Sequence, residues 1–318
     1  MELFLSCDWG TSAFRLRLVR MKDLQVLGEL KTDQGIASVY AAWREQTALD
    51  RQQWYKRQLL QQVEQLRLEL GLASLAEIPL VISGMASSSI GMMELSYAMI
   101  PAGLDGSGLK TEWLDLEVMK VLIISGLRTE SDVMRGEETK LAGLLDQLPD
   151  SERDQLILLP GTHPKHVVVR NQQVVDFTTF MTGEFFALLS SQGVLAASVE
   201  KTGDLSTLTN RESFVNAVMR SRELPFLHHS FLVRTNQLLF NKSKEENYHY
   251  LSGILIGEEL KAVKGDSVYL LGSQFHTSLY ALACEVLGID VAGVYDADEA
   301  LLRGQRELLS IAIKNCLA

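Results

Sequence analysis

The stretch Leu3-Phe4-Leu5-Ser6-Cys7-Asp8-Trp9-Gly10-Thr11-Ser12 decides the fold of this chain. An apolar run ends in a small-residue turn, and residues 14–18 then alternate apolar with basic side chains. This order predicts a buried strand, a glycine turn and a β-hairpin. The same order returns at residues 156–163, Leu-Ile-Leu-Leu-Pro-Gly-Thr-His, before a second hairpin with its turn near Asn171-Gln172. The chain therefore looks duplicated.

The two turns, Gly10-Thr11-Ser12 and Gly161-Thr162-His163, point to phosphate binding. A glycine followed by hydroxyl residues lets backbone N–H groups and side-chain donors approach phosphate oxygens closely. Asp8 adds a carboxylate that is suited to a Mg²⁺ ion on those phosphates, through water because Mg²⁺ gives up its hydration shell reluctantly. The corresponding Leu159 is not acidic. We expect two phosphate sites that face each other, with the metal on the first.

Composition excludes several function classes. The chain has 318 residues, of which 47% are hydrophobic and 22% charged, and this suits one large or two ordinary domains with sizeable cores. A net charge of −10 argues against nucleic acid or an anionic membrane as partner. No apolar run approaches the roughly twenty residues of a membrane span. Three scattered cysteines without a CxxC motif, and a start that lacks a signal-peptide pattern, favour a cytoplasmic protein with reduced thiols.

Strand and helix patterns alternate along the rest of the chain. Strands are expected at residues 80–84, 121–124, 268–271 and 291–294, and helices at residues 54–70, 138–148, 182–264 in several pieces, 278–287 and 299–317. This alternation predicts an α/β fold of two lobes, each a mixed sheet flanked by helices, with a cleft between the lobes. We expect the lobes at residues 1–127 and 128–298, with the final helix, 299–318, packing back on the first lobe.

The junction Gly272-Ser273 is a second nucleotide signal. A strand that ends in Gly-Ser before a helix offers N–H donors at the edge of the sheet where open α/β sheets bind ligands. Gly253 and Gly257 lie one turn apart on a preceding helix, and each costs about 1 kcal/mol relative to alanine. Either another backbone or the nucleotide must therefore come close to them.

Glu137 and Glu138 are the candidate acids. They follow Arg135-Gly136 at the start of a predicted helix, where acidic residues also simply favour the helix dipole. A sugar hydroxyl that attacks a γ-phosphoryl group needs a nearby carboxylate to take its proton. We favour Glu137 as the base, with Glu138 as the alternative and Arg135 beside them.

These motifs, in this order, resemble the actin and hexokinase superfamily, which has a two-lobed actin-like ATPase (ribonuclease H-like) fold. More specifically, the chain resembles the 2-dehydro-3-deoxygalactonokinase family nearly end to end. The resemblance is carried by Asp8 to Ser12 with Arg15, Ser83-Gly84-Met85, Met134 to Thr139, Pro160 to His163 with Lys165, Thr182-Gly183-Glu184, and residues 251–257. It implies transfer of the ATP γ-phosphoryl group, with Mg²⁺, to the terminal hydroxyl of 2-dehydro-3-deoxy-D-galactonate in galactonate breakdown.

The resemblance also implies roles for individual residues. Asp8 would hold the metal, and Glu137 would face the substrate hydroxyl. The cofactor-binding set is Asp8, Gly10, Thr11, Ser12, Gly161, Thr162, His163, Lys165, Gly272 and Ser273. The substrate-binding set is Arg15, Ser83, Gly84, Met85 and Arg135. An arginine suits the carboxylate of the sugar acid, although Arg15 on its strand fits a solvated face equally well.

Three side chains of the second hairpin have competing interpretations. Lys165 either steadies a phosphate or faces water. His163 and His166 have HxxH spacing, but without nearby acids they are expected to serve a structural or phosphate role and not to bind a metal.

Pro164, His166 and Met92 depart from the family pattern. The alternative substrate is therefore another sugar or a related keto-deoxy sugar acid. The other class in view is a regulatory ATPase of the same fold without kinase activity. ATP turnover that depends on an acceptor would indicate the kinase. The expected partners are a small sugar acid and ATP. A homodimer is the alternative to a monomer.

Overall fold

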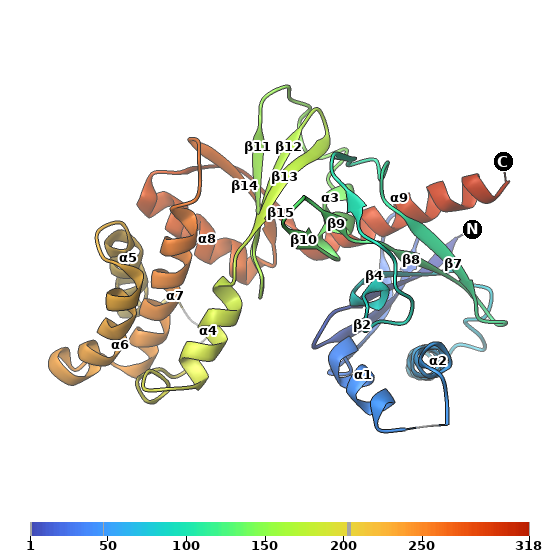
Figure 1. The fold of residues 1–318 in the computed structure, drawn as a ribbon, viewed down its shortest axis with the longest axis horizontal. Coiled ribbons are helices and arrows are strands. Elements are labelled where there is room, and N and C mark those ends of the chain that lie inside the picture. The colour runs from blue at the N-terminus through green and yellow to red at the C-terminus, as the bar shows by residue number, and fades with distance from the viewer. Residues whose placement is uncertain (1, 47, 202–204, 318) are drawn as a thin grey trace. The chain divides into compact units, whose positions relative to one another are not determined.

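The computed structural model describes residues 2–46, 48–201 and 205–317 (Figure 1). It divides the chain into two compact units. Unit 1 comprises residues 1–154, 169–176 and 297–318, and unit 2 comprises residues 155–168 and 177–296.

Unit 1 is built on a mixed sheet with the strand order β3-β2-β1-β4-β8-β7. Strand β1 pairs antiparallel with β2 and parallel with β4, which in turn pairs parallel with β8. The strands are β1 (Leu3–Trp9), β2 (Phe14–Arg20), β3 (Val26–Thr32), β4 (Leu80–Gly84), β7 (Thr111–Asp115) and β8 (Lys120–Ile124). The predicted first hairpin is therefore confirmed, and it extends into a third strand.

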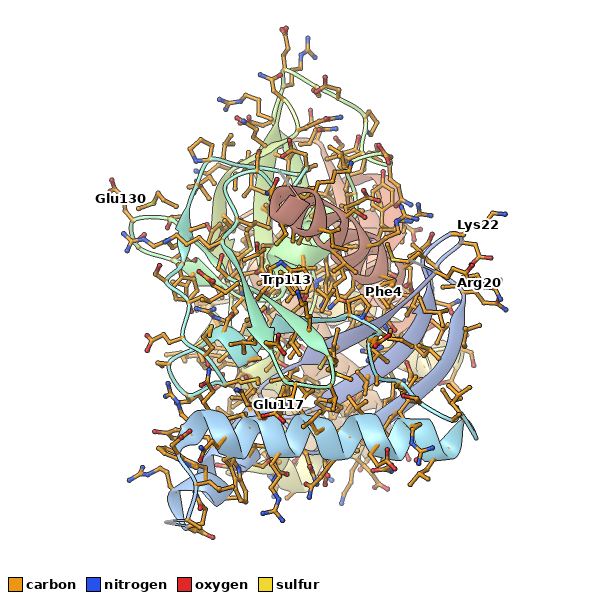
Figure 2. The ribbon with its side chains drawn as sticks, turned by 90° about the vertical axis from the view of Figure 1, so that its right-hand side faces the viewer. Phe4, Arg20, Lys22, Trp113, Glu117 and Glu130 are labelled. Carbon is orange, nitrogen blue, oxygen red and sulfur yellow. The ribbon has the colours of Figure 1, made fainter. Side chains whose placement is uncertain are left out.

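Helices cover both faces of this sheet, as the buried strands require. Helices α1 (Ile36–Arg44) and α2 (Arg51–Glu69) pack against Leu5, Cys7 and Trp9, whereas α9 (Ala297–Leu317) packs against Phe4 and its neighbours on the other face. Figure 2 shows α2 and α9 on the two sides of the sheet, with Phe4 labelled near α9. The remaining elements are η1 (Met85–Ser87), β5 (Ala98–Met99), β6 (Ala102–Gly103), β9 (Leu127–Arg128), β10 (Val133–Met134) and α3 (Glu137–Ala142).

The second sheet has the strand order β15-β14-β11-β12-β13-β6. Its strands are β11 (Gln155–Leu159), β12 (Lys165–Arg170), β13 (Gln173–Thr179), β14 (Ser267–Gly272) and β15 (Asp290–Asp296), with β6 at the edge. Asn171 and Gln172 both adopt positive φ, 50° and 54°, as a tight two-residue hairpin turn requires. Strands β11, β14 and β15 pair in parallel, as β1, β4 and β8 do. The two sheets thus repeat one strand order, which agrees with the duplication expected from the sequence.

The helices of unit 2 are α4 (Thr182–Ser191), η2 (Ala196–Ser198), α5 (Leu208–Ser221), α6 (Phe226–Phe240), α7 (Lys244–Leu260) and α8 (Gln274–Leu287). Helix α5 explains the glycines of α7. A Cβ atom on Gly253 would lie 2.5 Å from the Phe214 carbonyl oxygen, and one on Gly257 would lie 2.5 Å from Ser221 Oγ. The close neighbour of these glycines is therefore the next helix, and the alternative that they approach the nucleotide is wrong.

Two boundaries differ from those expected. Residues 128–154 group with unit 1, because β9 pairs with β5 and because α3 packs on α9. The helix expected at residues 138–148 ends at Ala142 and continues only as turns. Helix α9 belongs to unit 1, and it begins directly after β15, the last strand of unit 2.

Candidate functional site

The first Gly-Thr turn leaves β1 and leads into β2. The amide of Gly10 donates to the Ala13 carbonyl at 2.9 Å, which closes the turn, and the hydroxyl-bearing Thr11 and Ser12 are exposed. The start of α1 fixes the turn from behind, because the amides of Ile36 and Ala37 donate to the carbonyls of Gly10 and Thr11. Two exposed hydroxyl groups thus stand on a rigid turn.

Asp8 lies at the carboxyl end of β1, directly opposite Arg15 in the β1–β2 register. Its carboxylate is 26% exposed and lies 3.9 Å from the Arg15 guanidinium. Among the residues that the structure describes, no group of three His, Cys, Asp or Glu side chains could hold a metal ion. A metal at Asp8 would therefore take most of its ligands from water or from a bound phosphate.

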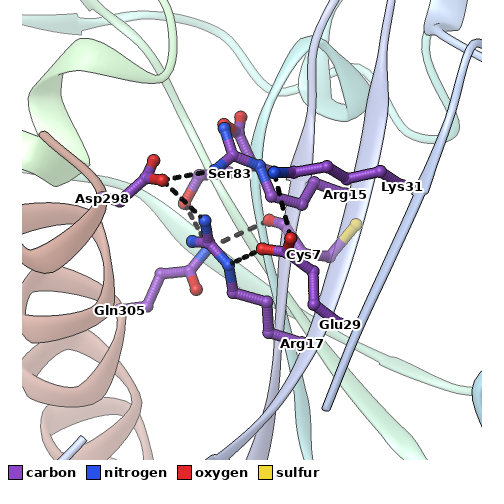
Figure 3. Close-up of polar contacts among 9 residues, drawn as sticks. Cys7, Arg15, Arg17, Glu29, Lys31, Ser83, Asp298 and Gln305 are labelled. Carbon is purple, nitrogen blue, oxygen red and sulfur yellow. Dashed lines mark hydrogen bonds and ion pairs between the residues drawn. The ribbon is translucent and has the colours of Figure 1, made fainter. Parts of the chain in front are cut away.

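Arg15 belongs to an ion-pair cluster, shown in Figure 3, and not to a solvated face. Asp298, at the start of α9, accepts from Arg15 Nη1 at 2.5 Å and from Arg17 Nη2 at 2.8 Å. Burial alone would raise the pKa of Asp298, but Arg17 and Arg15 outweigh it, so that pKa is lowered. Arg17 also donates to Glu29 at 2.6 Å. The cluster holds the Arg15 guanidinium beside Asp8.

Helix α9 also fixes the ends of β1 and β4 from behind. Gln305 is fully buried, and its Nε2 donates to the Cys7 carbonyl at 2.9 Å and to Ser83 Oγ at 3.0 Å (Figure 3). Ser83 itself is 1% exposed. The structure thus places Ser83 inside unit 1, whereas the Met85 side chain that follows is half-buried.

Two glycines bring the Arg135–Glu138 segment against the end of β4. Gly84 has a φ of +94°, and a Cβ there would lie 2.7 Å from the Trp9 carbonyl oxygen. Gly136 has a φ of +106°, and a Cβ there would lie 3.3 Å from Gly84 Cα. Because Asp8 and Ser83 are register partners on neighbouring strands, unit 1 gathers its predicted site residues at one edge of its sheet.

The two adjacent glutamates have different surroundings. Glu138 is 2% exposed, and its carboxyl group accepts from the Gly136 amide at 2.7 Å and from Thr139 Oγ1 at 3.1 Å. Burial, reinforced by the charge of Glu137, raises the pKa of Glu138 to about 8. Glu137 is half-buried, and its Oε2 accepts from the Arg135 amide at 3.0 Å. Of the two, Glu137 is therefore the acid within reach of a ligand.

Arg135 is held by its surroundings. Its Nη1 donates to Ser87 Oγ, its Nη2 donates to the Leu95 carbonyl at 3.3 Å, and its guanidinium lies 4.2 Å from the centre of the Tyr97 ring. Such fixing reduces the entropy that is lost when the remaining donors bind a ligand.

The second Gly-Thr turn lies against the start of α4. A Cβ on Gly183 would lie 2.4 Å from the Gly161 carbonyl oxygen, and the Glu184 amide donates to the Thr162 carbonyl at 3.0 Å. Thr162 and His163 are exposed. This turn is therefore fixed by a helix start, as the first turn is by α1.

The three hairpin side chains differ from their expected surroundings. The expectation that His163 and His166 lack nearby acids is wrong: His163 Nε2 lies 2.5 Å from Glu184 Oε2, and His166 Nε2 lies 3.0 Å from Glu259 Oε1. Glu184 lies on α4, the helix that follows the hairpin, and Glu259 lies on the distant α7. Lys165 is 4% exposed and its ammonium donates to the His163 carbonyl at 2.9 Å, so this lysine does not face water.

A pocket of about 290 Å³ opens beside this turn, wholly within unit 2. Its lining combines hydroxyl, imidazole and aromatic side chains from α4, α7 and α8. The lining residues are Gly161, Thr162, Thr182, Gly183, Phe186, Ala187, Tyr248, His249, Ser252, Leu255, Ile256, Phe275, His276, Leu279 and Tyr280. An apolar pocket with a few polar groups is the usual form of a small-molecule site.

Gly272 ends β14 and Ser273 leads into α8, whose first turn belongs to this lining. Ser273 is the residue before the helix, and its Oγ lies 2.9 Å from His276 Nδ1. The pocket is lined by Phe275 and His276 in the first turn. The aromatic lining residues Phe186, Tyr248 and Phe275 were not predicted from the sequence. The spacing of Tyr248, Ser252 and Leu255 along α7, away from the glycines that face α5, is the signal that could have found that wall.

The fold and these two glycine turns define the class of protein: the chain has the actin-like ATPase fold. One solved structure of this fold is the activator of the 2-hydroxyisocaproyl-CoA dehydratase from Clostridium difficile. It matches with a TM-score of 0.50 at 10% identity, over 98% of this chain and 96% of that chain. A likeness at this identity shows the fold alone.

The chain belongs to the 2-keto-3-deoxy-galactonokinase family, whose model matches residues 8–308. A probable 2-dehydro-3-deoxygalactonokinase of Rhizobium meliloti (strain 1021) is 34% identical over 95% of this chain and 94% of its own length. The 2-dehydro-3-deoxygalactonokinase of Escherichia coli (strain K12) is 31% identical over 72% of this chain and 78% of its own length. A solved structure of a family protein from Sinorhizobium meliloti matches with a TM-score of 0.80 at 31% identity, over 98% of this chain and 96% of that chain.

These relatives are named as kinases, and membership in a kinase family of this fold implies ATP as a substrate. Within the described ranges, none of the helices has the length and apolar character needed to cross a membrane.

Proposed function

We propose that this protein transfers the γ-phosphoryl group of ATP to the 6-hydroxyl of 2-dehydro-3-deoxy-D-galactonate, in the breakdown of galactonate. The observation that carries the proposal is the apolar pocket beside the second Gly-Thr turn, in a chain that belongs to this kinase family. The acids and cations at the edge of the unit 1 sheet supply what the acceptor needs.

The pocket of unit 2 takes the nucleoside of ATP. Its aromatic and aliphatic walls suit a purine, and Ser252, His276 and Tyr248 offer polar contacts at the rim. The phosphates extend toward Gly161, Thr162 and His163, with Lys165 behind the turn. Thr11 and Ser12 on the first turn offer exposed hydroxyl groups to phosphate.

Glu137 acts as the general base. The oxygen of the sugar-acid hydroxyl attacks the γ-phosphorus, its proton passes to the Glu137 carboxylate, and the bond from the γ-phosphorus to the bridging oxygen breaks, so that ADP leaves. Glu138 is less suited, because its carboxyl group is buried and satisfied by Gly136 and Thr139. Glu138 instead fixes the turn that carries Glu137.

The carboxylate of the sugar acid binds near Arg135 and Arg15, with the half-buried Met85 contributing to the surface of the site and the buried Gly84 beneath it. A guanidinium that is already held in place suits a carboxylate, since its planar donors are preorganised. Ser83 supports this surface from beneath through its bond with Gln305.

The donor set fits a Mg²⁺ ion bound with the nucleotide. Mg²⁺ is typically held by one or two carboxylates together with substrate phosphates and water, and Asp8 offers one partly exposed carboxylate. When bound, the ion neutralises charge on the phosphates.

Asp8→Asn should raise the Mg²⁺ concentration for half-maximal rate by about tenfold, or roughly 1.4 kcal/mol. The exposed Asp23→Asn is the control, and an unchanged Mg²⁺ dependence in Asp8→Asn would remove Asp8 from this role.

The activity is tested by ADP release with ATP and a panel of 2-keto-3-deoxy sugar acids. We expect release with 2-dehydro-3-deoxy-D-galactonate, little with its stereoisomers, and almost none without an acceptor. Preference for another sugar acid would change the substrate and leave the reaction type intact. Turnover that is equal with and without every acceptor would instead indicate the regulatory ATPase.

We also propose that the chain forms a homodimer through α4 and α6. Every residue of α4 is at least partly exposed, and α6 exposes Leu227, Phe231 and Leu238 by 83%, 52% and 59% along one face. Exposed apolar side chains gathered on one face of a helix suit a protein interface, and most soluble oligomers are symmetric homo-oligomers. Sedimentation velocity should give a dimer for the wild type and a monomer for the double variant Leu227→Glu, Phe231→Glu. A wild-type monomer would overturn this proposal.

The cytoplasm is the proposed location. The three cysteines are free thiols, two of them buried, which suits a reducing compartment, and both proposed substrates are small metabolites.

A further inference from the structure

A buried carboxylate lies behind the pocket of unit 2. Glu259, near the end of α7, is 4% exposed, and three side chains from separate elements converge on it. His166 Nε2 lies 3.0 Å from its Oε1, Tyr280 OH donates to its Oε2 at 2.7 Å, and Thr182 Oγ1 donates to the same oxygen.

The partners of Glu259 belong to the walls of the pocket. Thr182 is the first residue of α4 and Tyr280 lies on α8, and both line the pocket, whereas His166 lies on β12 behind it. Glu259 is not among the lining residues. Glu259 therefore contacts residues that line the pocket but does not line it itself.

The contacts continue from Glu259 to the phosphate turn. Thr182 is followed by Gly183, where a Cβ would lie 2.4 Å from the Gly161 carbonyl oxygen and 2.7 Å from Thr162 Cα. Helix α4 and the turn are therefore packed directly against each other. A shift of Thr182 would be passed directly to Gly161 and Thr162.

We infer that Glu259 is a positioning residue for the nucleotide: its carboxylate fixes α4, α8 and β12 relative to one another, and so fixes both the pocket and the phosphate turn. This inference rests on the proposed function, in which that pocket holds ATP.

The network is built in a way that makes it rigid. A buried carboxylate is costly unless hydrogen bonds satisfy it, so the three partners and the acid hold one another in place. Burial first, and then the neighbouring Glu259, raise the pKa of Tyr280, so its hydroxyl keeps the proton that it donates. Burial and Glu259 likewise raise the pKa of the Cys284 thiol, to about 12.

The direction of the change in ATP affinity distinguishes a positioning role of Glu259 from a purely electrostatic one. A negative charge near an anionic nucleotide repels it, so if charge alone mattered, neutralising Glu259 would tighten ATP binding. If Glu259 positions the pocket, the same change weakens ATP binding, because an amide cannot accept from all three donors.

The test compares Glu259→Gln and Glu259→Asp with Glu246→Gln in the full-length protein. Glu246 lies on the same helix, and its carboxylate accepts from the Ser243 amide and pairs with Lys242, so Glu246→Gln removes an ion pair away from the pocket. We expect both Glu259 variants to raise the KM for ATP by about tenfold, with kcat within about threefold and the KM for the sugar acid unchanged. Glu246→Gln should lower the Tm and leave the KM for ATP unchanged.

An unchanged or lowered KM for ATP in folded Glu259→Gln would overturn the inference. If that variant does not fold, Tyr280→Phe removes a single donor and should raise the KM for ATP in the same direction by a smaller factor; no change there would overturn it equally. Ser252→Trp fills the pocket and so tests whether the pocket holds ATP. This variant distinguishes failure of the inference about Glu259 from failure of the proposed function. If Ser252→Trp leaves the KM for ATP unchanged, the pocket does not hold ATP, and if only Ser252→Trp raises it, the inference about Glu259 alone fails.

Discussion

At the scale of single residues, side chains of the same type differ in burial, pKa and ion pairing because their surroundings differ. Glu137 and Glu138 are adjacent in sequence, yet Glu138 is buried with its pKa raised to about 8, and Glu137 is half-buried at the surface of unit 1. Arg15 and Arg17 alternate on one strand, and both bind the carboxylate of Asp298. Burial distinguishes the two glutamates, whereas a carboxylate far away in the chain fixes both arginines.

Glu137→Gln should lower kcat by at least about 100-fold, because the amide cannot take the proton of the acceptor hydroxyl. Nucleotide binding, measured by calorimetry with a non-hydrolysable ATP analogue, should stay within about twofold of wild type, since the proposed role of Glu137 is to take the proton of the acceptor and not to bind ATP. The exposed Glu130→Gln serves as the control and should leave both quantities unchanged. Retained turnover in Glu137→Gln would move the base elsewhere.

Glu138 should make the protein less stable as pH rises. Its pKa in the folded protein, about 8, lies above its ordinary value of 4.5. Between these values the folded state holds a proton that the unfolded state has released, so the free energy of unfolding falls by up to about 1.4 kcal/mol per pH unit. The stability is fully present below pH 4.5 and is lost as pH rises through about 8.

Urea unfolding at several pH values measures this loss. Glu138→Gln carries no charge over the same range and should lose less stability from pH 5 to pH 8.5 than the wild type. Parallel curves for the two proteins would show that Glu138 does not titrate in that range.

At the scale of elements, α9 supports the site. A Cβ on Gly304 would lie 1.8 Å from the Thr139 carbonyl oxygen, and one on Gly143 would lie 1.9 Å from the Ala300 carbonyl oxygen. Helix α3, which carries both glutamates, thus lies directly on α9, and α9 also holds β1 and β4 through Gln305. One helix sets the relative positions of Asp8, Gly84 and Glu137.

Gly304→Ala should therefore affect both stability and catalysis. The added methyl group has no room, so we expect a loss of about 3 kcal/mol in the free energy of unfolding and a fall in kcat as α3 shifts. Lys314→Ala, at an exposed position of the same helix, should change neither. If Gly304→Ala kept wild-type stability and kcat, the close packing of α3 on α9 would be refuted.

The elements also show what local sequence can and cannot predict. Period-two alternation at residues 14–18 and the glycine turns predicted both hairpins, because these signals lie within a few residues of each other. The sequence indicated that Gly253 and Gly257 are approached closely, but the partner, α5, lies more than thirty residues away in the chain. Asp298 and Gln305 were missed for the same reason, since their partners are at the other end of the chain.

At the scale of the whole molecule, the repeated strand order explains why the chain carries two Gly-Thr turns. Both turns leave a central strand of a mixed sheet, and both are fixed by the start of a helix, α1 or α4. Only the first has an acid before it, at Asp8. The prediction from the sequence is that each of the two turns binds phosphate.

Thr11→Val and Thr162→Val test that prediction together. Each should raise the KM for ATP by about tenfold, because each removes a hydroxyl donor to a phosphate at little change in side-chain volume. Thr179→Val on β13 is the control. If only one of the two substitutions changed the KM for ATP, the triphosphate would be bound by a single turn.

The activity proposed for this chain is phosphorylation of 2-dehydro-3-deoxy-D-galactonate on its terminal hydroxyl. Phosphorus NMR of a reaction with ATP and this sugar acid tests it most directly. We expect ADP and one new phosphomonoester signal, in equal amounts, with the phosphorus coupled to the protons on carbon 6. Inorganic phosphate in place of the ester, or an ATP spectrum that does not change, would rule this activity out.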